Sequence, residues 1–326
     1  MDNGRLWLLC WWMAIVAVLS TSVAAQESPT RPASTSKQKK AQKQGKTEES
    51  FTLVGAGDIA WCRDLSGARA TAALIENIPG TVFAAGDLAY DKGTIAEFQN
   101  CYDPTWGKFR DRTKPAPGNH EYNGSEATGY FQYWGAQAGD PKKGYYSYDL
   151  GVWHVVVLNT NCDIASLGGC GEGSPEEAWL RADLAAHPNS CIVAYGHHAL
   201  FSSGILPGHS RHTELRPFWQ ALYAAHADLV LAGHEHSYER FAPQDPQGKL
   251  DPEHGIRQIT AGTGGRSHTL LGFAQANSEV RNDDTYGVLK LTLSPGKYEW
   301  QFVPESGMTF RDSGKGTCHN TSPIAK

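Results

Sequence analysis

Five short apolar runs in this chain each end in a glycine that is followed by a residue able to bind a metal ion. In chain order these ends are Gly57-Asp58, Gly86-Asp87, Gly118-Asn119, Gly196-His197 and Gly233-His234-Glu235-His236. Glycine at the end of a strand allows a sharp turn and a close backbone approach, so several short side chains can be aimed at one point. In an open α/β sheet that point is the crevice beyond the carboxyl ends of the strands. The pattern therefore favours a fold whose strand ends share one site.

Helical segments follow several of these apolar runs. We expect strands at 51–56, 81–85, 152–158, 191–195, 229–232 and 257–261, and helices at 66–77, 94–100, 175–187 and 214–226. Ser174, with Glu177 three residues later, is a start signal for the third helix. Residues 286–303 read as a hairpin that turns at Ser294-Pro295-Gly296. Alternating strands and helices predict an α/β layered fold, with antiparallel strands added at its end.

The N-terminal 50 residues differ from the rest of the chain. Residues 1–25 read as a signal peptide, with Arg5 before an apolar run and small residues ahead of Gln26. An uncleaved anchor is the alternative, although the run is shorter than the ~18 residues of a membrane span. Residues 26–50 read as a disordered Ser/Lys-rich linker, which serves as a spacer or touches an anionic surface. We expect a secreted or extracytoplasmic protein without stable membrane insertion after signal removal.

Charge separates the linker from the body of the protein. The chain carries −5, residues 1–25 are neutral overall and residues 26–50 carry +3, so residues 51–326 carry −8. Nucleic-acid binding depends on Lys and Arg that neutralise phosphates. A body this acidic argues against a nucleic-acid partner.

Six of the seven cysteines lie beyond the signal segment, and none has the Cys-x-x-Cys spacing of metal or redox sites. An even number in an exported protein favours disulfides. Six cysteines allow fifteen pairings, of which Cys162 with Cys170 is the pair favoured first because it closes a short loop.

The strand-end residues have the chemistry of a transition-metal site. Two aspartates, one asparagine and three histidines form a mixed oxygen and nitrogen set, which suits zinc, manganese or iron. Each residue alone could equally be an ordinary turn or strand-end residue. Together they are too many ligands for one metal ion.

The same motifs carry a family resemblance. They are Gly57-Asp58-Ile59-Ala60, Gly86-Asp87-Leu88-Ala89-Tyr90, Gly118-Asn119-His120-Glu121, Val193-Ala194-Tyr195-Gly196-His197 and Gly233-His234-Glu235-His236. Over about residues 51–305 the chain resembles the calcineurin-like metallophosphoesterase superfamily, and within it the purple acid phosphatase-like branch. The resemblance implies a βαβαβ two-sheet sandwich flanked by helices, with the metal site at the C-terminal ends of the strands. Ala60 replaces the usual Gly, and Ala199 stands where purple acid phosphatases often have Pro.

The resemblance also implies a ligand set for two metal ions. Asp58, Asp87, Tyr90 and His236 would hold one ion, and Asp87, Asn119, His197 and His234 the other. Asp87 would bridge ions about 3.5–4 Å apart. Tyr90 would favour iron at the first position, beside a divalent Zn, Mn or Fe; a core aromatic is its alternative role.

The implied activity is hydrolysis of phosphomonoesters by attack of a metal-bound hydroxide, as in an acid phosphatase. His120 is the candidate for the leaving oxygen, with a packed structural histidine as the alternative. His209 is favoured over His212 as a substrate contact on the following loop, and His198 is expected to point away. A phosphodiesterase or nucleotide-cleaving relative and a non-catalytic metal-binding surface protein are the competing functions. The implied partner is a small phosphate-ester substrate.

Two further features are assigned no function. The run Ala261-Gly262-Thr263-Gly264-Gly265-Arg266 resembles a phosphate cradle but lacks the Lys-Ser/Thr pair of a nucleotide site. Seven aromatics at Trp106, Tyr122, Tyr130, Tyr133, Trp134, Tyr145 and Tyr146 read as packing more than as a substrate groove. We place the catalytic domain at residues 51–310 and a C-terminal tail at residues 311–326.

Overall fold

The computed structural model describes residues 49–123, 126–188, 190–205 and 211–320. The expected signal peptide and nearly all of the linker lie outside these ranges. Within them, no helix is long and apolar enough to cross a membrane.

A six-stranded sheet is built around the first strand of the body. Its order is β15 (Ser313–Thr317), β14 (Lys297–Pro304), β13 (Gly287–Ser294), β1 (Phe51–Ala56), β3 (Thr81–Ala85) and β5 (Thr113–Ala116). β1, β3 and β5 run parallel, whereas β13 pairs antiparallel with β1, Leu53 facing Leu291. β13 and β14 form the expected hairpin, with Ser294 paired to Lys297.

A second, seven-stranded sheet contains most of the remaining strands. Its order is β12 (Ser278–Asn282), β10 (Tyr238–Phe241), β11 (Arg257–Ala261), β9 (Leu229–Ala232), β8 (Cys191–Tyr195), β7 (Trp153–Val157) and β6 (Tyr146–Leu150). β2 (Ala60–Trp61) and β4 (Ala89–Tyr90) pair in parallel as a separate two-stranded sheet.

Helices are present in the four predicted segments, although only a three-residue α-helix falls within 94–100. Two further α-helices, at residues 119–122 and 128–134, were not predicted. The α-helices are α1 (Ser66–Glu76), α2 (Ile95–Glu97), α3 (Asn119–Tyr122), α4 (Thr128–Trp134), α5 (Pro175–Ala186) and α6 (Arg216–Ala224). Segments of 3₁₀-helix or π-helix are η1 (Phe98–Tyr102), η2 (Trp106–Arg112), η3 (Gly135–Ala138), η4 (Ala165–Leu167) and η5 (Thr213–Leu215). Ser174 caps α5 as expected, because its side chain accepts a hydrogen bond from the Glu177 backbone N–H.

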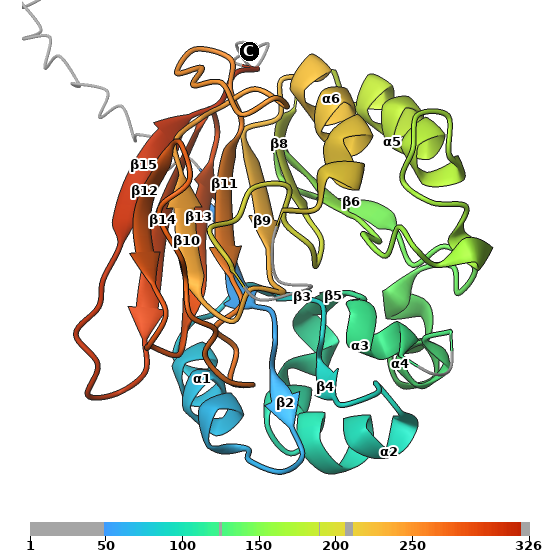
Figure 1. The fold of residues 1–326 in the computed structure, drawn as a ribbon, viewed down its shortest axis with the longest axis vertical. Coiled ribbons are helices and arrows are strands. Elements are labelled where there is room, and N and C mark those ends of the chain that lie inside the picture. The colour runs from blue at the N-terminus through green and yellow to red at the C-terminus, as the bar shows by residue number, and fades with distance from the viewer. Residues whose placement is uncertain (1–48, 124–125, 189, 206–210, 321–326) are drawn as a thin grey trace, which may run out of the picture. The chain divides into compact units, whose positions relative to one another are not determined.

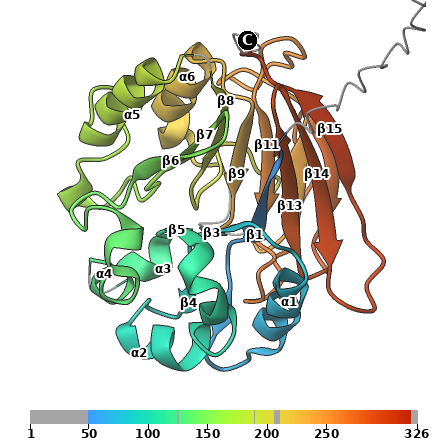
Figure 2. The same cartoon turned by 180° about the vertical axis from the view of Figure 1, so that it is seen from behind.

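Alternation along the strands explains the layers. In β8, Val193 and Tyr195 face the core between the two sheets, while Ile192 and Ala194 face α5 and α6. In β1, Leu53 faces the same central core, and Val54 packs on the α1 side. The sheets therefore pack face to face, with helices over both outer faces (Figure 1, Figure 2). The expected α/β two-sheet sandwich flanked by helices is confirmed.

Three disulfides brace this sandwich, and the favoured pair Cys162–Cys170 is one of them. The other two join Cys62 to Cys101 and Cys191 to Cys318. The second of these attaches the C-terminal segment to the start of β8.

The C-terminal boundary predicted from the sequence is wrong. Residues 313–317 form β15 in the six-stranded sheet instead of a tail. Gly314 lies against the Trp300 ring and Gly316 against the Tyr298 ring, where any β-carbon would come within about 2.4 Å of a ring atom. The strand lacks an apolar pattern because two of its residues are glycines on which aromatic side chains of β14 pack.

Candidate metal centre

Asp58, Tyr90 and His236 form one half of the site. Asp58 directly follows the turn after β1, and Tyr90 ends β4. The Tyr90 hydroxyl donates to Asp58 Oδ1 at 2.8 Å and lies 3.3 Å from His236 Nε2. His236 Nε2 also lies 3.3 Å from Asp58 Oδ1. A carboxylate, a phenol and an imidazole thus converge from three different segments.

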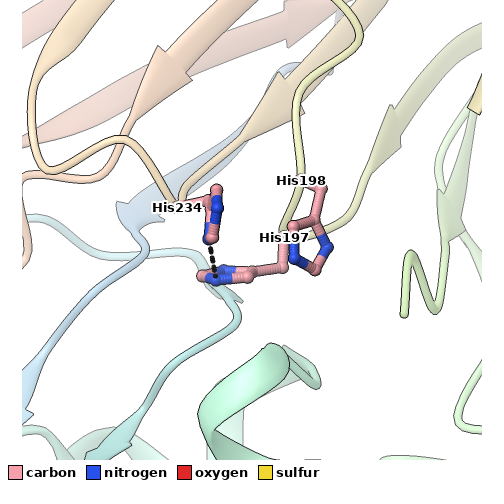
Figure 3. Close-up of side chains that lie close together, drawn as sticks. All are labelled: His197, His198 and His234. Carbon is pink, nitrogen blue, oxygen red and sulfur yellow. Dashed lines mark hydrogen bonds between the residues drawn. The ribbon is translucent and has the colours of Figure 1, made fainter. Parts of the chain in front are cut away.

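Asp87, Asn119, His197 and His234 form the other half. His197 Nε2 lies 3.3 Å from Asp87 Oδ2, 3.0 Å from Asn119 Oδ1 and 3.1 Å from His234 Nδ1. Figure 3 shows the His197 and His234 rings meeting at that contact. Asp58, Asp87 and His197 also each offer a ligand atom within 4.8 Å of the others. The structure therefore brings all seven predicted ligand residues together.

The backbone is bent to make this convergence possible. Asp58, Asp87 and His234 have φ of 60°, 53° and 67°, a left-handed conformation that non-glycine residues seldom adopt. Such conformations persist where the surrounding structure holds them, and they cluster at functional sites. Gly86 precedes one of these bends with φ of 77°, and a β-carbon there would lie 2.5 Å from the His197 ring. Ala60 has no positive φ, so its replacement of glycine is tolerated.

The buried carboxylates of this site are the observation that indicates bound metal ions. The Asp58 and Asp87 side chains are buried. Burial opposes ionisation, yet the neighbouring histidines outweigh it and hold the pKa of both carboxyls below the ordinary value. Burial would lower the pKa of His197, but the Asp87 carboxylate raises it to about 9. Two buried carboxylates thus demand positive charge at this point, which bound cations would supply.

Hydrogen bonds on the far side of two histidine rings support the same fit. His197 Nδ1 lies 2.9 Å from the Ala85 carbonyl oxygen, which only accepts, so Nδ1 carries a proton. His236 Nδ1 lies 2.7 Å from Ser267 Oγ. Each ring therefore turns Nε2 toward the site. Metal-binding histidines are characteristically oriented by such a partner on the other nitrogen.

His120 lies at the rim of the site. Its backbone N–H donates to Asp87 Oδ1 at 2.8 Å, and its ring Nε2 lies 3.8 Å from Asp87 Oδ2. Ring Nδ1 lies 2.6 Å from the Asp91 carbonyl oxygen. The imidazole is fixed at both edges and is partly exposed, with 27% of its side-chain surface accessible. This placement allows contact with a substrate that reaches Asp87.

His209 lies outside the described residues, but two other histidines join the site. The expectation that His198 points away from the site is wrong. The centre of its ring lies 4.9 Å from that of His197 and 4.5 Å from that of His234. β8 ends at Tyr195, so strand alternation no longer sets the direction of His198. His198 Nδ1 contacts Thr160 Oγ1 at 3.0 Å. Burial, followed by the charge of His197, holds its pKa well below the ordinary value.

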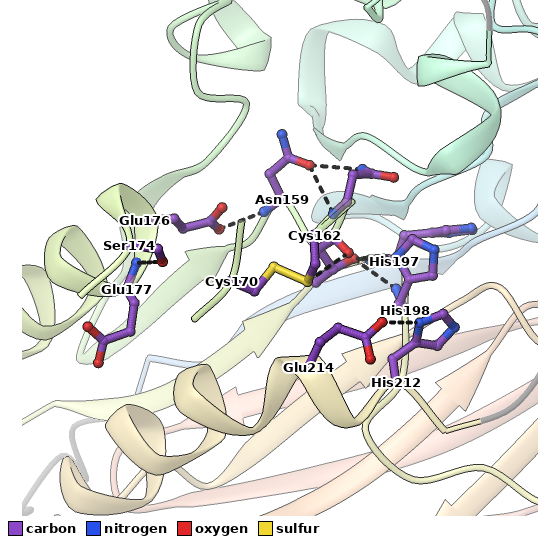
Figure 4. The surroundings of a disulfide bond; sticks show 12 residues. Asn159, Cys162, Cys170, Ser174, Glu176, Glu177, His197, His198, His212 and Glu214 are labelled. Atoms are coloured by element: carbon purple, nitrogen blue, oxygen red, sulfur yellow. Dashed lines mark hydrogen bonds and ion pairs between the residues drawn. A yellow bond between two sulfur atoms is a disulfide. The ribbon is translucent and has the colours of Figure 1, made fainter. Parts of the chain in front are cut away.

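His212 reaches the cluster from the loop before η5. Its ring lies 4.4 Å from His198 and 5.1 Å from His234, and Nδ1 lies 2.8 Å from Glu214 Oε1 (Figure 4). Nε2 is buried and makes no hydrogen bond within the described part of the chain. From the sequence, His209 is favoured over His212 as the substrate contact. On an irregular loop, the position of a residue in the sequence does not predict where its side chain points.

The two features assigned no function serve packing. Tyr133 stacks on Phe98, and Trp134 packs edge-on against Tyr133, in the core beside α1. The glycine run after β11 lies against the strand end of Asp58, with the Gly264 N–H donating to the Gly57 carbonyl at 2.9 Å.

Comparison with known proteins agrees with this fold and site. The family model for calcineurin-like phosphoesterases matches residues 51–238, and the chain belongs to that family. Its relatives are purple acid phosphatases. Probable purple acid phosphatase 20 of Arabidopsis thaliana is 28% identical over 259 residues, covering 70% of this chain and 56% of the relative. Purple acid phosphatase 23 of the same plant is 30% identical over 205 residues, covering 51% of this chain and 43% of the relative.

A solved structure shares the fold. Purple acid phosphatase PPD1 from yellow lupin (Lupinus luteus) seeds superposes with a TM-score of 0.65 at 18% identity, covering 86% of this chain and 57% of that one. The chain spans about half the length of the curated relatives it matches.

Proposed function

We propose that this protein is a secreted phosphatase with two metal ions that hydrolyses phosphomonoesters. The position of Asp87 carries the proposal. Asp87 contacts His197 of one half of the site, and its carboxylate lies within 4.8 Å of the Asp58 carboxylate of the other half. A carboxylate in that place can be shared by two cations. Three disulfides support an extracytoplasmic location.

The residues divide into two ligand sets. Asp58, Asp87, Tyr90 and His236 would hold iron, because a phenol oxygen is a hard donor. Asp87, Asn119, His197 and His234 would hold a divalent Zn, Mn or Fe. When bound, two such ions would lower the pKa of a water molecule and offset the charge of the phosphate.

The protein's own residues then orient the substrate and move a proton. His120 is held by Asp87 and by the Asp91 carbonyl, so its Nε2 faces the side on which a phosphate would lie. In its protonated form this nitrogen donates to the leaving oxygen, which must gain a proton as its bond to phosphorus breaks. His212, held by Glu214, presents Nε2 as a contact for a phosphate oxygen. His209 keeps its proposed role as a substrate contact.

Steady-state kinetics with 4-nitrophenyl phosphate and bis(4-nitrophenyl) phosphate tests the proposal on protein loaded with iron plus zinc or manganese. We expect the monoester to be preferred and Asp87→Ala or Asn119→Ala to abolish hydrolysis. Asp111→Ala removes an exposed carboxylate of η2 and is the matched control. Strong preference for the diester would identify a phosphodiesterase instead, and inactivity of the loaded wild-type protein with both esters would support a non-catalytic role.

Elemental analysis with a visible absorption spectrum tests the metal assignment separately. Two metals and a tyrosinate-to-iron band that Tyr90→Phe removes are expected. Two zinc ions and no colour would contradict the role proposed for Tyr90.

A further inference from the structure

The glycine run 262–265 has a structural consequence: it places Arg266 at the metal centre. The Arg266 backbone N–H donates to the Asp58 carbonyl at 3.0 Å. Gly265 has φ of 140°, and a β-carbon there would lie 2.2 Å from the Ala68 backbone nitrogen of α1. The run is therefore held between the Asp58 strand end and α1. Arg266 extends from this fixed base.

The Arg266 guanidinium lies over two aromatic rings beside the site. Its Cζ is 4.0 Å from the centre of the Trp61 ring and 4.9 Å from that of Tyr90, the candidate ligand. Trp61 and Tyr90 are partners in the β2–β4 pairing, so the two rings are neighbours. Stacking on aromatic faces holds a guanidinium in place while its N–H groups stay available at the edge.

Arg266 has few partners for the donors it carries. Its Nε is buried and makes no hydrogen bond within the described ranges. Its ion pair with Asp91 is long, with Nη2 at 3.7 Å from Oδ1. A guanidinium has five N–H donors in a planar fork that matches phosphate oxygens. A buried donor without a partner destabilises the free protein, and a bound anion would offset that cost.

A second arginine lies next to the first. Arg63 Nη2 donates to Asp91 Oδ2 at 3.3 Å, and its side chain is 74% exposed. Arg63 and Trp61 flank Cys62, whose disulfide to Cys101 anchors their loop to η1. Asp91 is the one carboxylate paired with both arginines among the described residues. Two guanidinium groups therefore share the Asp91 carboxylate at this corner.

This corner lies beside His120 of the candidate metal centre. Asp91 connects the two regions: its carbonyl contacts His120 Nδ1 at 2.6 Å, and its carboxylate pairs with Arg266 and Arg63. His120 is the residue proposed to face the leaving oxygen. An anionic leaving group that passes His120 would next meet the two guanidinium groups.

We propose that Arg266, with Arg63 as an outer contact, binds a phosphate group carried by the leaving group. The inference rests on the proposed phosphatase function. It predicts that, among singly substituted phosphates, the protein prefers those whose leaving group carries a phosphate, such as inorganic pyrophosphate and nucleoside diphosphates. In the reaction, water oxygen bonds to the terminal phosphorus, the bond from that phosphorus to the bridging oxygen breaks, and the departing phosphate retains that oxygen. His120 donates a proton to the same oxygen, and Arg266 holds the departing phosphate.

Kinetics of Arg266→Gln with inorganic pyrophosphate and 4-nitrophenyl phosphate test the assignment on the metal-loaded full chain. We expect kcat/KM for pyrophosphate to fall about 10- to 100-fold, the loss typical of one charged hydrogen-bonding contact. The loss with 4-nitrophenyl phosphate should stay below about threefold, because its leaving group bears no phosphate. Arg63→Gln should reproduce the selectivity with a smaller loss, since Arg63 is more exposed.

Arg311→Gln is the matched control, because it removes the same charge from an exposed site outside the metal centre. Equal losses with both substrates in Arg266→Gln would overturn the proposal and assign Arg266 to support of Tyr90. No loss with either substrate would also overturn it.

Equilibrium binding separates this inference from the proposed activity. Calorimetry with methylenediphosphonate and with methylphosphonate needs no turnover, so it works even if the loaded protein hydrolyses nothing. Wild-type protein should bind the diphosphonate more tightly, and Arg266→Gln should remove most of that difference at unchanged metal content. Equal affinities of wild-type protein for the two phosphonates would refute the anion contact.

Discussion

Glu121 accepts a hydrogen bond from the backbone N–H of Asp87, with Oε2 2.9 Å from the nitrogen. The same buried carboxylate accepts from the Leu88 N–H at 2.8 Å and the Gly118 N–H at 2.7 Å. One side chain therefore ties the turn after β3 to the turn after β5. These turns carry Asp87 and Asn119, so Glu121 positions two candidate ligands without facing the site.

Glu121→Gln should loosen both turns at once. An amide has only one acceptor oxygen, and its NH₂ group would face backbone N–H groups that also donate. Partners that orient metal ligands typically contribute 10- to 100-fold in metal affinity or activity, so we expect a loss of about that size. Metal titration and kcat measure it, with the exposed Glu76→Gln as control. Unchanged metal affinity and kcat would show that the turns hold their shape without this carboxylate.

His212→Gln should weaken catalysis while leaving the metals in place. The ring contacts Glu214 and lies beside the rings of His198 and His234, but it is not among the candidate ligands. Loss of one such contact should lower kcat/KM for 4-nitrophenyl phosphate about 10-fold or more. His254→Gln, at a half-exposed histidine away from the site, is the control. Loss of metal together with activity would instead make His212 part of the metal-binding structure.

His154 makes the stability of the protein depend on pH. The buried ring lies 2.8 Å from both Asp149 Oδ1 and Asp183 Oδ2, and it joins β7 to α5. Burial would lower its pKa, but the hydrogen bonds and charges of Asp183 and Asp149 outweigh it and raise the pKa above the ordinary value. A histidine whose pKa is raised on folding contributes stability below its unfolded pKa of about 6.5, and loses it as pH rises through the folded pKa.

At low pH, protonation of Asp183 reduces the stability that the His154–Asp183 contact contributes. Burial opposes its ionisation, but the hydrogen bonds of His154 and Ser147 hold its pKa below the ordinary value. Its stabilisation is therefore present above about pH 4 and is lost as pH falls through the folded pKa. Urea unfolding of wild-type protein and His154→Gln should show the largest difference between about pH 4 and 6.5 and a smaller one at pH 9. A difference that grows toward pH 9 would contradict this account.

The convergence of the strand-end candidate residues could be predicted from the sequence because local pattern and chemistry coincide there. An apolar run fixes the strand, glycine fixes the turn, and the next residue must then lie at the common edge. His198 and His212 escaped this logic because they follow irregular segments, where no period relates sequence position to side-chain direction. Arg266 was hidden for another reason: its glycine run resembles a phosphate cradle, whereas its conformation is set by contacts with Asp58 and α1 from distant parts of the chain.

The C-terminal strand was missed because its stabilising contacts are also distant in sequence. β15 pairs with β14, and the segment next to it carries Asp312, which accepts hydrogen bonds from Arg240 at 2.7 Å and Tyr238 at 2.7 Å. None of these contacts requires alternating apolar residues within 311–320, so the sequence there shows no strand pattern. The disulfide of Cys318 then fixes the end of the segment to β8.

Removing the Cys191–Cys318 disulfide should destabilise the protein more than removing Cys162–Cys170. The first closes a loop of 127 residues and the second a loop of 8. A disulfide lowers the entropy of the unfolded chain by an amount that grows with the logarithm of loop length. The expected loss in free energy of unfolding is about 5 kcal/mol for the long loop and about 2.5 kcal/mol for the short one. Denaturant unfolding of Cys191→Ala/Cys318→Ala and Cys162→Ala/Cys170→Ala measures both. Because Cys318 also anchors the strand that supports Trp300 and Tyr298, native-state packing should add to the first loss, and a smaller loss for the long loop would refute both arguments.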